Sequence, residues 1–263
     1  GRMEPMTLQR VDLGIGGNFA AARELNRKGV TNVRVLPQLG VNPDKFRPRE
    51  KPVSQVFTIG YVGRLVLEKG VDLLIRAVAG LEGEWQLKIL GQGAEKGALY
   101  ALAEMLSVLD KIEFLPSIPH EDVAEFMQSI EVLVLPSRTT NNWAEQFGHV
   151  LVEAMSSGVP VVASMSGSIS EVVGNGGLLF PEDDEEFLRA VLERVRDEPG
   201  LARKLGQTGR LRVLERYTWE HIADETLRYY RELMGEATSS SVINIGEEKL
   251  WGSEQDPTKV KKR

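Results

Sequence analysis

The chain has 263 residues, enough for one large domain or one and a half, and its 42% hydrophobic content is ordinary for a soluble globular protein. Its 32 Lys and Arg residues against 38 Asp and Glu residues give a net charge of −6, which offers no bulk attraction for nucleic acid. The lack of cysteine excludes disulfides and thiolate metal sites, and three scattered histidines argue against a zinc cluster. We therefore expect no metal site, and we expect any anion site to be local.

Signals for membrane insertion or export are not apparent in the sequence. No apolar stretch approaches the roughly 20 residues of a membrane-spanning helix, and the opening "GRMEPMTLQR" lacks the apolar core of a signal peptide. We expect a cytoplasmic protein without a membrane span, and peripheral attachment at the inner membrane surface stays open.

The first 52 residues differ from the rest of the chain. The stretch "VDLGIGGNFAAARELNRKGV" predicts a strand and a helix, and "TNVRVLPQLGVNPDKFRPRE" predicts a second strand followed by a Pro-rich connector that ends near Pro52. We interpret residues 1–52 as the remnant of an N-terminal domain with its interdomain linker.

From residue 53 onward, short β-branched runs alternate with amphipathic segments. The expected strands cover residues 57–63, 87–91, 112–115, 132–137, 159–164 and 177–180, and the expected helices cover residues 70–81, 95–109 and 121–130. Apolar strands alternating with helices predict an α/β fold, a doubly wound parallel sheet covered on both faces.

The sequence after about Asp183 is helical only. Three helices are expected over residues 183–197, 201–217 and 218–234, and Thr218 is a suitable N-cap for the last. Residues 53–235 should therefore form one Rossmann-like domain. The polar tail at residues 236–263 lacks sustained periodicity, and we expect it to be disordered.

A first candidate site is "GYVGRLVLEKG", where a strand ends at Gly63, Arg64 follows, and Lys69 precedes the next helix. Ligands of open α/β sheets bind at the carboxyl ends of the strands, where helix N-termini offer free amides. The Arg64 guanidinium can donate two parallel hydrogen bonds and the Lys69 ammonium group adds a point charge, and together these cations suit a diphosphate. A plain strand-to-helix turn with solvated cations would use the same residues.

The stretch "ILGQGAEKGAL" places Gly91 and Gly93 at the end of another strand. A lone G-x-G is weak evidence for a dinucleotide site, because the third glycine of that motif is Lys96 here. A tight turn is the simpler interpretation. The two glycines nevertheless fall at the same sheet edge as Arg64.

The stretch "AEQFGHVLVEAM" carries Glu145 on a loop, Phe147 and Gly148 at a helix start, and Glu153 among apolar helix residues. A carboxylate among apolar residues needs a hydrogen-bond or ion-pair partner. A ribose diol could be that partner, since one carboxylate can accept hydrogen bonds from both hydroxyls. Gly148 would let backbone donors approach a ligand closely. Alternatively, Glu145 only complements the helix dipole and Glu153 is exposed.

These motifs, with "LVLPS" and "SGSISEVVGNGGLLFPEDD", occur in an order and spacing that resemble the family 4 (group 1) retaining glycosyltransferases, over about residues 10–235. The resemblance implies the nucleotide-sugar-binding C-terminal half of a GT-B fold. The expected donor is a nucleoside-diphosphate sugar, a substrate rather than a cofactor, and the expected acceptor is a glycan or lipid.

The resemblance also implies roles for individual residues. Arg64 and Lys69 would hold the donor diphosphate, Glu145 would meet the donor sugar, and these three would be the catalytic residues. Glu153 would bind the ribose. Backbone amides and close turns would complete the donor site, and they involve Gly63, Gly91, Gly93, Phe147, Gly148 and His149.

Some positions depart from the family pattern. Ser166 and Gly167 stand where many relatives have paired glycines, and Glu171 could cap the segment that follows it. Most of the N-terminal half, which supplies a Gly-rich loop and a histidine in the family, is missing. His120, His149 and His221 match none of its roles, and we expect them to be structural or solvated, with His120 at a helix start.

Mechanistically, cations fixed at the leaving diphosphate stabilise the transition state more than the ground state, so no metal is required. The absence of an Asp-x-Asp sequence in the catalytic stretch agrees. Retention rests on the resemblance alone, and Glu145 is not assigned as a nucleophile.

Three other interpretations remain. The chain could be a donor-binding module that is inactive alone, either as part of a split enzyme with a separate N-terminal-half protein or as a truncated fragment. A nucleotide-sugar epimerase shares the scaffold but is disfavoured by the Glu145 to Glu153 pattern, and a phosphate-receiving regulatory domain would need clustered aspartates at strand ends.

Overall fold

The computed structural model describes residue 8, residues 10–49 and residues 56–236. The expected end of the linker near Pro52 and the expected tail from residue 237 lie outside these ranges. The chain divides into two compact units, Gly1–Thr226 and Leu227–Arg263.

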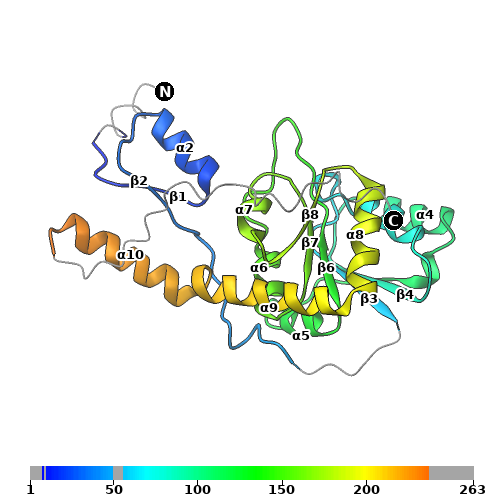
Figure 1. Ribbon diagram of the computed structural model, residues 1–263. Coiled ribbons are helices and arrows are strands. Elements are labelled where there is room, and N and C mark those ends of the chain that lie inside the picture. The colour runs from blue at the N-terminus through cyan, green and yellow to red at the C-terminus, as the bar shows by residue number, and fades with distance from the viewer. Residues whose placement is uncertain (1–7, 9, 50–55, 237–263) are drawn as a thin grey trace, which may run out of the picture. The chain divides into compact units, whose positions relative to one another are not determined.

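The larger unit contains a six-stranded parallel sheet in the order β5-β4-β3-β6-β7-β8 (Figure 1). The strands are β3 (Phe57–Val62), β4 (Trp85–Leu90), β5 (Ile112–Leu115), β6 (Val132–Leu135), β7 (Val161–Ser164) and β8 (Gly177–Phe180). This order runs outward in both directions from β3 and β6, which is the doubly wound arrangement of a Rossmann-like domain. The predicted fold class is confirmed.

Helices connect the strands and cover the sheet. They are α3 (Val71–Ala79), α4 (Lys96–Met105), α5 (Val123–Gln128), α6 (His149–Ser156), α7 (Ile169–Val173), α8 (Glu185–Asp197) and α9 (Pro199–Arg216), with 3-10 turns η1 (Leu67–Lys69) and η2 (Leu109–Lys111). Helix α3 packs against α4 and α8, whereas α6 packs against α5, α7 and α9. The two groups form the two helical layers that the continuous apolar strands require.

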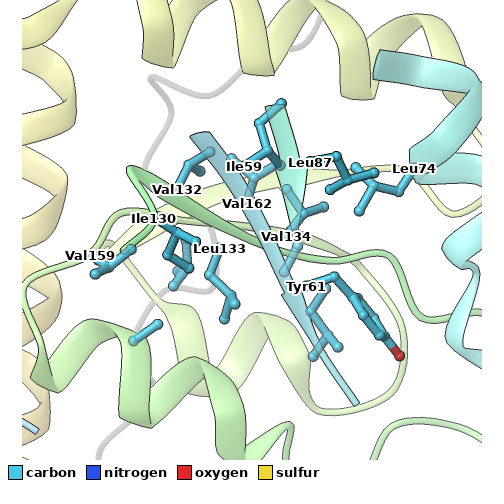
Figure 2. Packing of buried hydrophobic residues seen from close by; sticks show 14 of the residues in the cluster. Ile59, Tyr61, Leu74, Leu87, Ile130, Val132, Leu133, Val134, Val159 and Val162 are labelled. Atoms are coloured by element: carbon cyan, nitrogen blue, oxygen red, sulfur yellow. The ribbon is translucent and has the colours of Figure 1, made fainter. Parts of the chain in front are cut away.

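The core lies where the central strands meet these helices. Figure 2 shows Ile59 of β3 near Leu87 of β4 and Leu74 of α3, with Tyr61 farther along β3, and all four side chains are fully buried. In the sheet, Ile59 is opposite both Leu87 and Val132, so apolar side chains of three adjacent strands line up. This rigid centre fixes the positions of the loops that leave the strands.

Local signals explain several helix boundaries. The Asp184 side chain accepts a hydrogen bond from the N–H of Phe187 and thereby caps α8. Helix α9 begins at Pro199, whose missing N–H is no loss in the first turn. Helix α10 (Trp219–Leu233) starts after Thr218, whose hydroxyl accepts from the N–H of His221, so the predicted N-cap is confirmed.

The head folds as predicted into strand, helix and strand. Strand β1 (Gly14–Gly16) pairs in parallel with β2 (Val33–Val35), and α2 (Phe19–Arg27) connects them. Asn18 caps α2, and its amide also donates to the backbone oxygen of Gln146 at 2.9 Å.

The prediction for Glu171 was wrong. Glu171 lies within α7, which the sequence did not predict, and its carboxylate accepts from the N–H of Phe19 at 3.0 Å. It therefore serves the first turn of α2, 152 positions away in sequence, and does not cap the segment that follows it. His120 also precedes its helix by a short turn, since α5 starts only at Val123.

No helix within the described ranges is both long enough and apolar enough to cross a lipid bilayer.

Candidate functional site

The candidate residues gather at the carboxyl edge of the sheet. Lys69 follows β3 and Glu145 follows β6, the two strands between which the winding direction reverses. Open α/β sheets bind their ligands at such a reversal point, because the loops on either side separate there. The topology thus places two predicted site residues where a ligand is expected.

Lys69 and Glu145 form a largely buried ion pair. The Lys69 Nζ atom lies 2.5 Å from Oε2 of Glu145, and the two side chains are only 15% and 10% exposed. The hydroxyl of Ser137 donates to the same carboxylate oxygen at 3.0 Å, and the Trp143 ring lies 4.9 Å from Nζ. Both charges are therefore compensated within the protein, whereas the sequence analysis assigned Lys69 to the diphosphate and Glu145 to the donor sugar and did not predict that the two would pair.

Close packing fixes the loop that carries Lys69. Gly70 begins α3 with φ 65°, and a Cβ atom there would lie 2.0 Å from the carbonyl oxygen of Pro136. Only glycine fits this left-handed conformation and this contact. The end of β6 and the start of α3 are consequently held against each other.

Arg138 strengthens the same junction, and no sequence motif indicated this role. Its guanidinium forms two hydrogen bonds with Asp72, at 2.6 and 2.9 Å, and a further one with Asp183. Hydrogen bonds with Asp72 chiefly, opposed in part by burial, raise the pKa of Arg138. Arg138 is thus a permanent cation that connects the loop after β6 to the first turn of α3 and to the loop before α8, and its charge is already used within the fold.

The start of α6 presents unpaired backbone donors. Gly148 precedes α6 with φ 70°, and no side chain of the described residues caps this helix. The first N–H groups of a helix have no helical acceptor and carry a partial positive charge. The Phe147 ring packs edge-on against Tyr217, with ring centroids 5.7 Å apart, and so holds the loop before the helix.

Glu153 is 4% exposed and has two histidine neighbours. Its Oε1 atom lies 2.6 Å from Nε2 of His120 and 3.3 Å from Nδ1 of His149. The expectation that Glu153 needs a partner is confirmed, and the alternative that Glu153 is exposed is wrong. Two of the three histidines, His120 and His149, are distant in sequence but close in space, which corrects the premise that was used against a metal cluster.

His149 is held from both sides. Its Nε2 atom lies 3.0 Å from the backbone oxygen of Gly40, and its Nδ1 faces Glu153. Burial lowers the pKa of His149, but the hydrogen bonds with Glu153 and Gly40 outweigh it and raise the pKa overall. His221, on α10, is not part of this cluster.

Arg64 and two of the predicted glycines, Gly63 and Gly91, border a cleft of about 220 Å³, whereas Gly93 and Gly148 are not among its lining residues. Val62, Leu90, Ile118 and Val123 give it apolar walls, and Gly63, Arg64, Gly91, Gln92 and Ser117 complete the lining. The Arg64 side chain is 65% exposed and makes only a loose contact with Glu68 at 3.6 Å. Of the two predicted cations, Arg64 is thus the more accessible.

Gly91 and Gly93 are required for packing. A Cβ atom at Gly91 would lie 1.9 Å from the backbone oxygen of Gly63, and one at Gly93 would lie 2.1 Å from that of Leu65. The loops after β3 and β4 thus touch backbone to backbone, so the tight-turn interpretation explains why both residues are glycine. The same contact shapes the floor of the cleft.

A larger open hollow of about 510 Å³ lies over the start of α8. Five of its lining residues are carboxylates, the run from Glu182 to Glu186, and Arg189 is the one cation of the lining. Such a lining repels anions, so the cleft beside Arg64 is the better candidate for a phosphorylated ligand.

Comparison with known proteins identifies the family. Residues 43–212 match the model of the glycosyl transferases group 1. The chain is 35% identical over 206 residues to the MMP alpha-(1->4)-mannosyltransferase of Mycolicibacterium hassiacum, with 76% of this chain and 48% of the relative covered. It therefore spans about half the length of that curated relative.

Solved structures show a similar fold. Sucrose-phosphate synthase from Thermosynechococcus elongatus superposes with a TM-score of 0.75 at 30% identity, covering 89% of this chain and 61% of the synthase. HepE from Anabaena, solved in complex with UDP-glucose, superposes with a TM-score of 0.74 at 20% identity, covering 88% of this chain and 67% of HepE. The match over residues 43–212 covers well over half of the chain, and the chain belongs to the group 1 glycosyl transferase family.

Proposed function

We propose that this chain supplies the donor site of a retaining glycosyltransferase that takes its sugar from a nucleoside-diphosphate sugar. The observation that carries the proposal is the buried Lys69–Glu145 pair at the reversal point of the sheet, beside the uncapped start of α6. A cation, a carboxylate and free backbone donors at one edge match the phosphate and hydroxyl groups of such a donor.

The diphosphate is assigned to Arg64, Lys69 and the helix N-termini. Arg64 is exposed and only loosely paired, so it can turn toward a ligand without breaking a strong contact. As the glycosidic bond breaks, negative charge grows on the leaving diphosphate, and fixed cations stabilise that charge in the transition state. Transfer by this route requires no metal.

The two glutamates are assigned to the two sugars of the donor. Glu145 is fixed by Lys69 and Ser137 and would accept from hydroxyls of the transferred sugar. Glu153 would accept from the ribose diol, with the backbone of Phe147, Gly148 and His149 completing the site. The base would enter the apolar cleft between Val62 and Ile118.

A thermal-shift screen with UDP, GDP and ADP tests the proposal. A ligand at 100 times its dissociation constant adds about 2.7 kcal/mol, or a melting-temperature rise of about 5–10 °C for a domain of this size. The nucleotide that gives the largest shift identifies the base. UDP is the first to test because HepE, of similar fold, has been solved with UDP-glucose.

A second candidate is a donor-binding half that is inactive alone. It is favoured by one observation, that the chain covers 48% of the mannosyltransferase and 61% of the synthase. In this account a separate protein or a further part of the same protein supplies the acceptor cleft for a glycan or lipid. Adding such a half to the chain would restore transfer.

A further inference from the structure

We infer that His120, His149 and Glu153 form a binding site for a single Zn²⁺ ion, and that zinc competes there with a nucleotide for Glu153. One ligand atom from each residue lies within 4.8 Å of the others. Two imidazoles and one carboxylate, with the fourth position left to water, are a ligand set that zinc uses in proteins.

The spacing within α6 suits a metal. His149 and Glu153 are four residues apart on one helix, so their side chains extend from the same face. Bonds of about 2.0–2.1 Å in tetrahedral geometry place two zinc ligands about 3.3–3.5 Å apart. The observed 3.3 Å between Nδ1 of His149 and Oε1 of Glu153 already has this value.

The backbone of Gly40 gives a second, independent indication. A carbonyl oxygen only accepts hydrogen bonds, so Nε2 of His149, at 3.0 Å from it, must carry a hydrogen. Nδ1 is then the ring nitrogen left for a metal ion, and it faces Oε1 of Glu153. Metal-binding histidines commonly donate their other N–H to a carbonyl in this way.

His120 is placed to be the third ligand. It comes from the turn before α5 and its side chain is 64% exposed, so it can adjust without disturbing the core. Its Nε2 atom lies 2.6 Å from Oε1 of Glu153, and a retreat of about 1 Å would bring it to zinc-ligand spacing. Its ring is nearly parallel to that of His149, with centroids 6.2 Å apart and an angle of 20°.

The binding test uses chain without a histidine tag and without nucleotide. Calorimetric titration with ZnCl₂ should give one site per chain, and Co²⁺ should produce the visible absorption of a tetrahedral complex at the same site. His120→Ala and His149→Gln should each weaken zinc binding at least about 10-fold. His221→Ala, which removes the third histidine of the chain, should leave it unchanged.

Selectivity gives a further readout. Mg²⁺ prefers oxygen ligands in octahedral geometry, so it should not compete with zinc at this site. The proposed site would be overturned if the wild-type chain did not bind zinc, or if all four proteins had the same zinc affinity. A loss of zinc affinity in only one of the variants His120→Ala and His149→Gln would also overturn it.

The competition with nucleotide rests on the proposed function and is tested separately. Saturating zinc should lower the affinity of the wild-type chain for its nucleoside diphosphate. In His120→Ala the same zinc concentration should leave the nucleotide affinity unchanged. Because the nucleotide itself can bind zinc, this variant also shows how much of any effect comes from that binding. Unchanged nucleotide affinity in zinc-loaded wild type would overturn the competition. If no nucleotide binds at all, the proposed function fails while the zinc titration still decides the metal site.

Discussion

At the scale of single residues, both proposals for this site depend on Glu153, because its carboxylate is assigned to the ribose of the donor and to the zinc ion. The apolar neighbours of Glu153 in the sequence correctly indicated a buried carboxylate that needs a partner. The partners could not be predicted, because His120 is 33 positions away and mostly exposed, and only the packing of α5 against α6 brings it to Glu153. The burial of Lys69 was missed for the same reason, since its partner Glu145 is 76 positions away.

Glu153→Gln should weaken the binding of nucleoside diphosphate and of nucleotide-sugar by the same factor, about 10-fold. Hydrogen bonds to a charged acceptor are roughly twice as strong as neutral ones, and the ribose is common to both ligands. Calorimetry with the two ligands measures the factors. A loss confined to the nucleotide-sugar would contradict the assignment of Glu153 to the ribose.

Glu145→Gln should leave the affinity for bare nucleotide within about 3-fold of wild type while discrimination among sugars falls. Hydrogen bonds to the carboxylate are worth about 1.5–3 kcal/mol, and the transferred sugar is the only part of the donor that is assigned to Glu145. The amide oxygen of Gln can still accept from Lys69 and Ser137, so the loop should stay in place. Competition binding with several nucleotide-sugars measures the effect. Equal losses for bare nucleotide in Glu145→Gln and Glu153→Gln would refute the division of roles.

At the scale of elements, strands were easier to predict than the loops that form the site. Continuous apolar runs placed all six strands of the sheet within about two residues, because burial on both faces requires such runs. Helix α7 was missed because five residues are too few to show a helical period. The backbone contacts of Gly70, Gly91 and Gly93 depend on strand order, which no local pattern contains.

Gly93→Ala should destabilise the domain by about 1–3 kcal/mol and weaken nucleotide binding, because a Cβ atom 2.1 Å from the backbone oxygen of Leu65 forces two loops apart at the cleft. Gly97→Ala is the matched control. It lies in α4 with no atom within 4 Å of its Cβ position, so it should stabilise the domain by up to about 1 kcal/mol. Urea denaturation compares the two, and equal stabilities would contradict the packing argument.

The free energy of unfolding of Glu171→Gln, relative to that of wild type, should increase as the pH rises from 4 to 7. Burial raises the pKa of Glu171 above its ordinary value, more than the Phe19 N–H and nearby arginines lower it. The folded wild type therefore binds more protons than the unfolded chain, and it loses stability as pH rises through the two pKa values.

Gln at position 171 still accepts from Phe19 but has no charge to bury. The difference in free energy of unfolding between Glu171→Gln and wild type should stay below about 1 kcal/mol, because the Glu171 carboxylate is only partly buried and solvent screens its charge. Melting temperatures at several pH values, with exposed Glu121→Gln as the control, measure it. A difference between Glu171→Gln and wild type that does not change with pH would show that burial of Glu171 has no such cost.

At the scale of the whole molecule, the chain provides one Rossmann-like half of a GT-B fold and covers about half of its curated relative. Family membership followed from motif order in the sequence, whereas the base, sugar and acceptor do not follow from any residue pattern. They depend on the detailed shape of the cleft and on the surface that faces it.

The purified chain should bind its donor but neither transfer nor hydrolyse the sugar efficiently, because a GT-B site lies between two domains and the acceptor must be held by the other one. Release of nucleoside diphosphate from nucleotide-sugar, with and without candidate acceptors, measures this. Efficient turnover by the isolated chain would contradict it.

The most direct test of the account is a calorimetric titration of the cognate nucleoside diphosphate into the wild-type chain, Arg64→Ala and the control Arg203→Ala, which removes an exposed arginine of α9. We predict one site in the wild type, the same affinity in Arg203→Ala, and a loss of about 10- to 100-fold in Arg64→Ala, the value of a hydrogen bond between charged groups. Equal affinity in all three proteins, or no binding of UDP, GDP or ADP at millimolar concentration, would contradict the assignment of this edge of the sheet as the donor site.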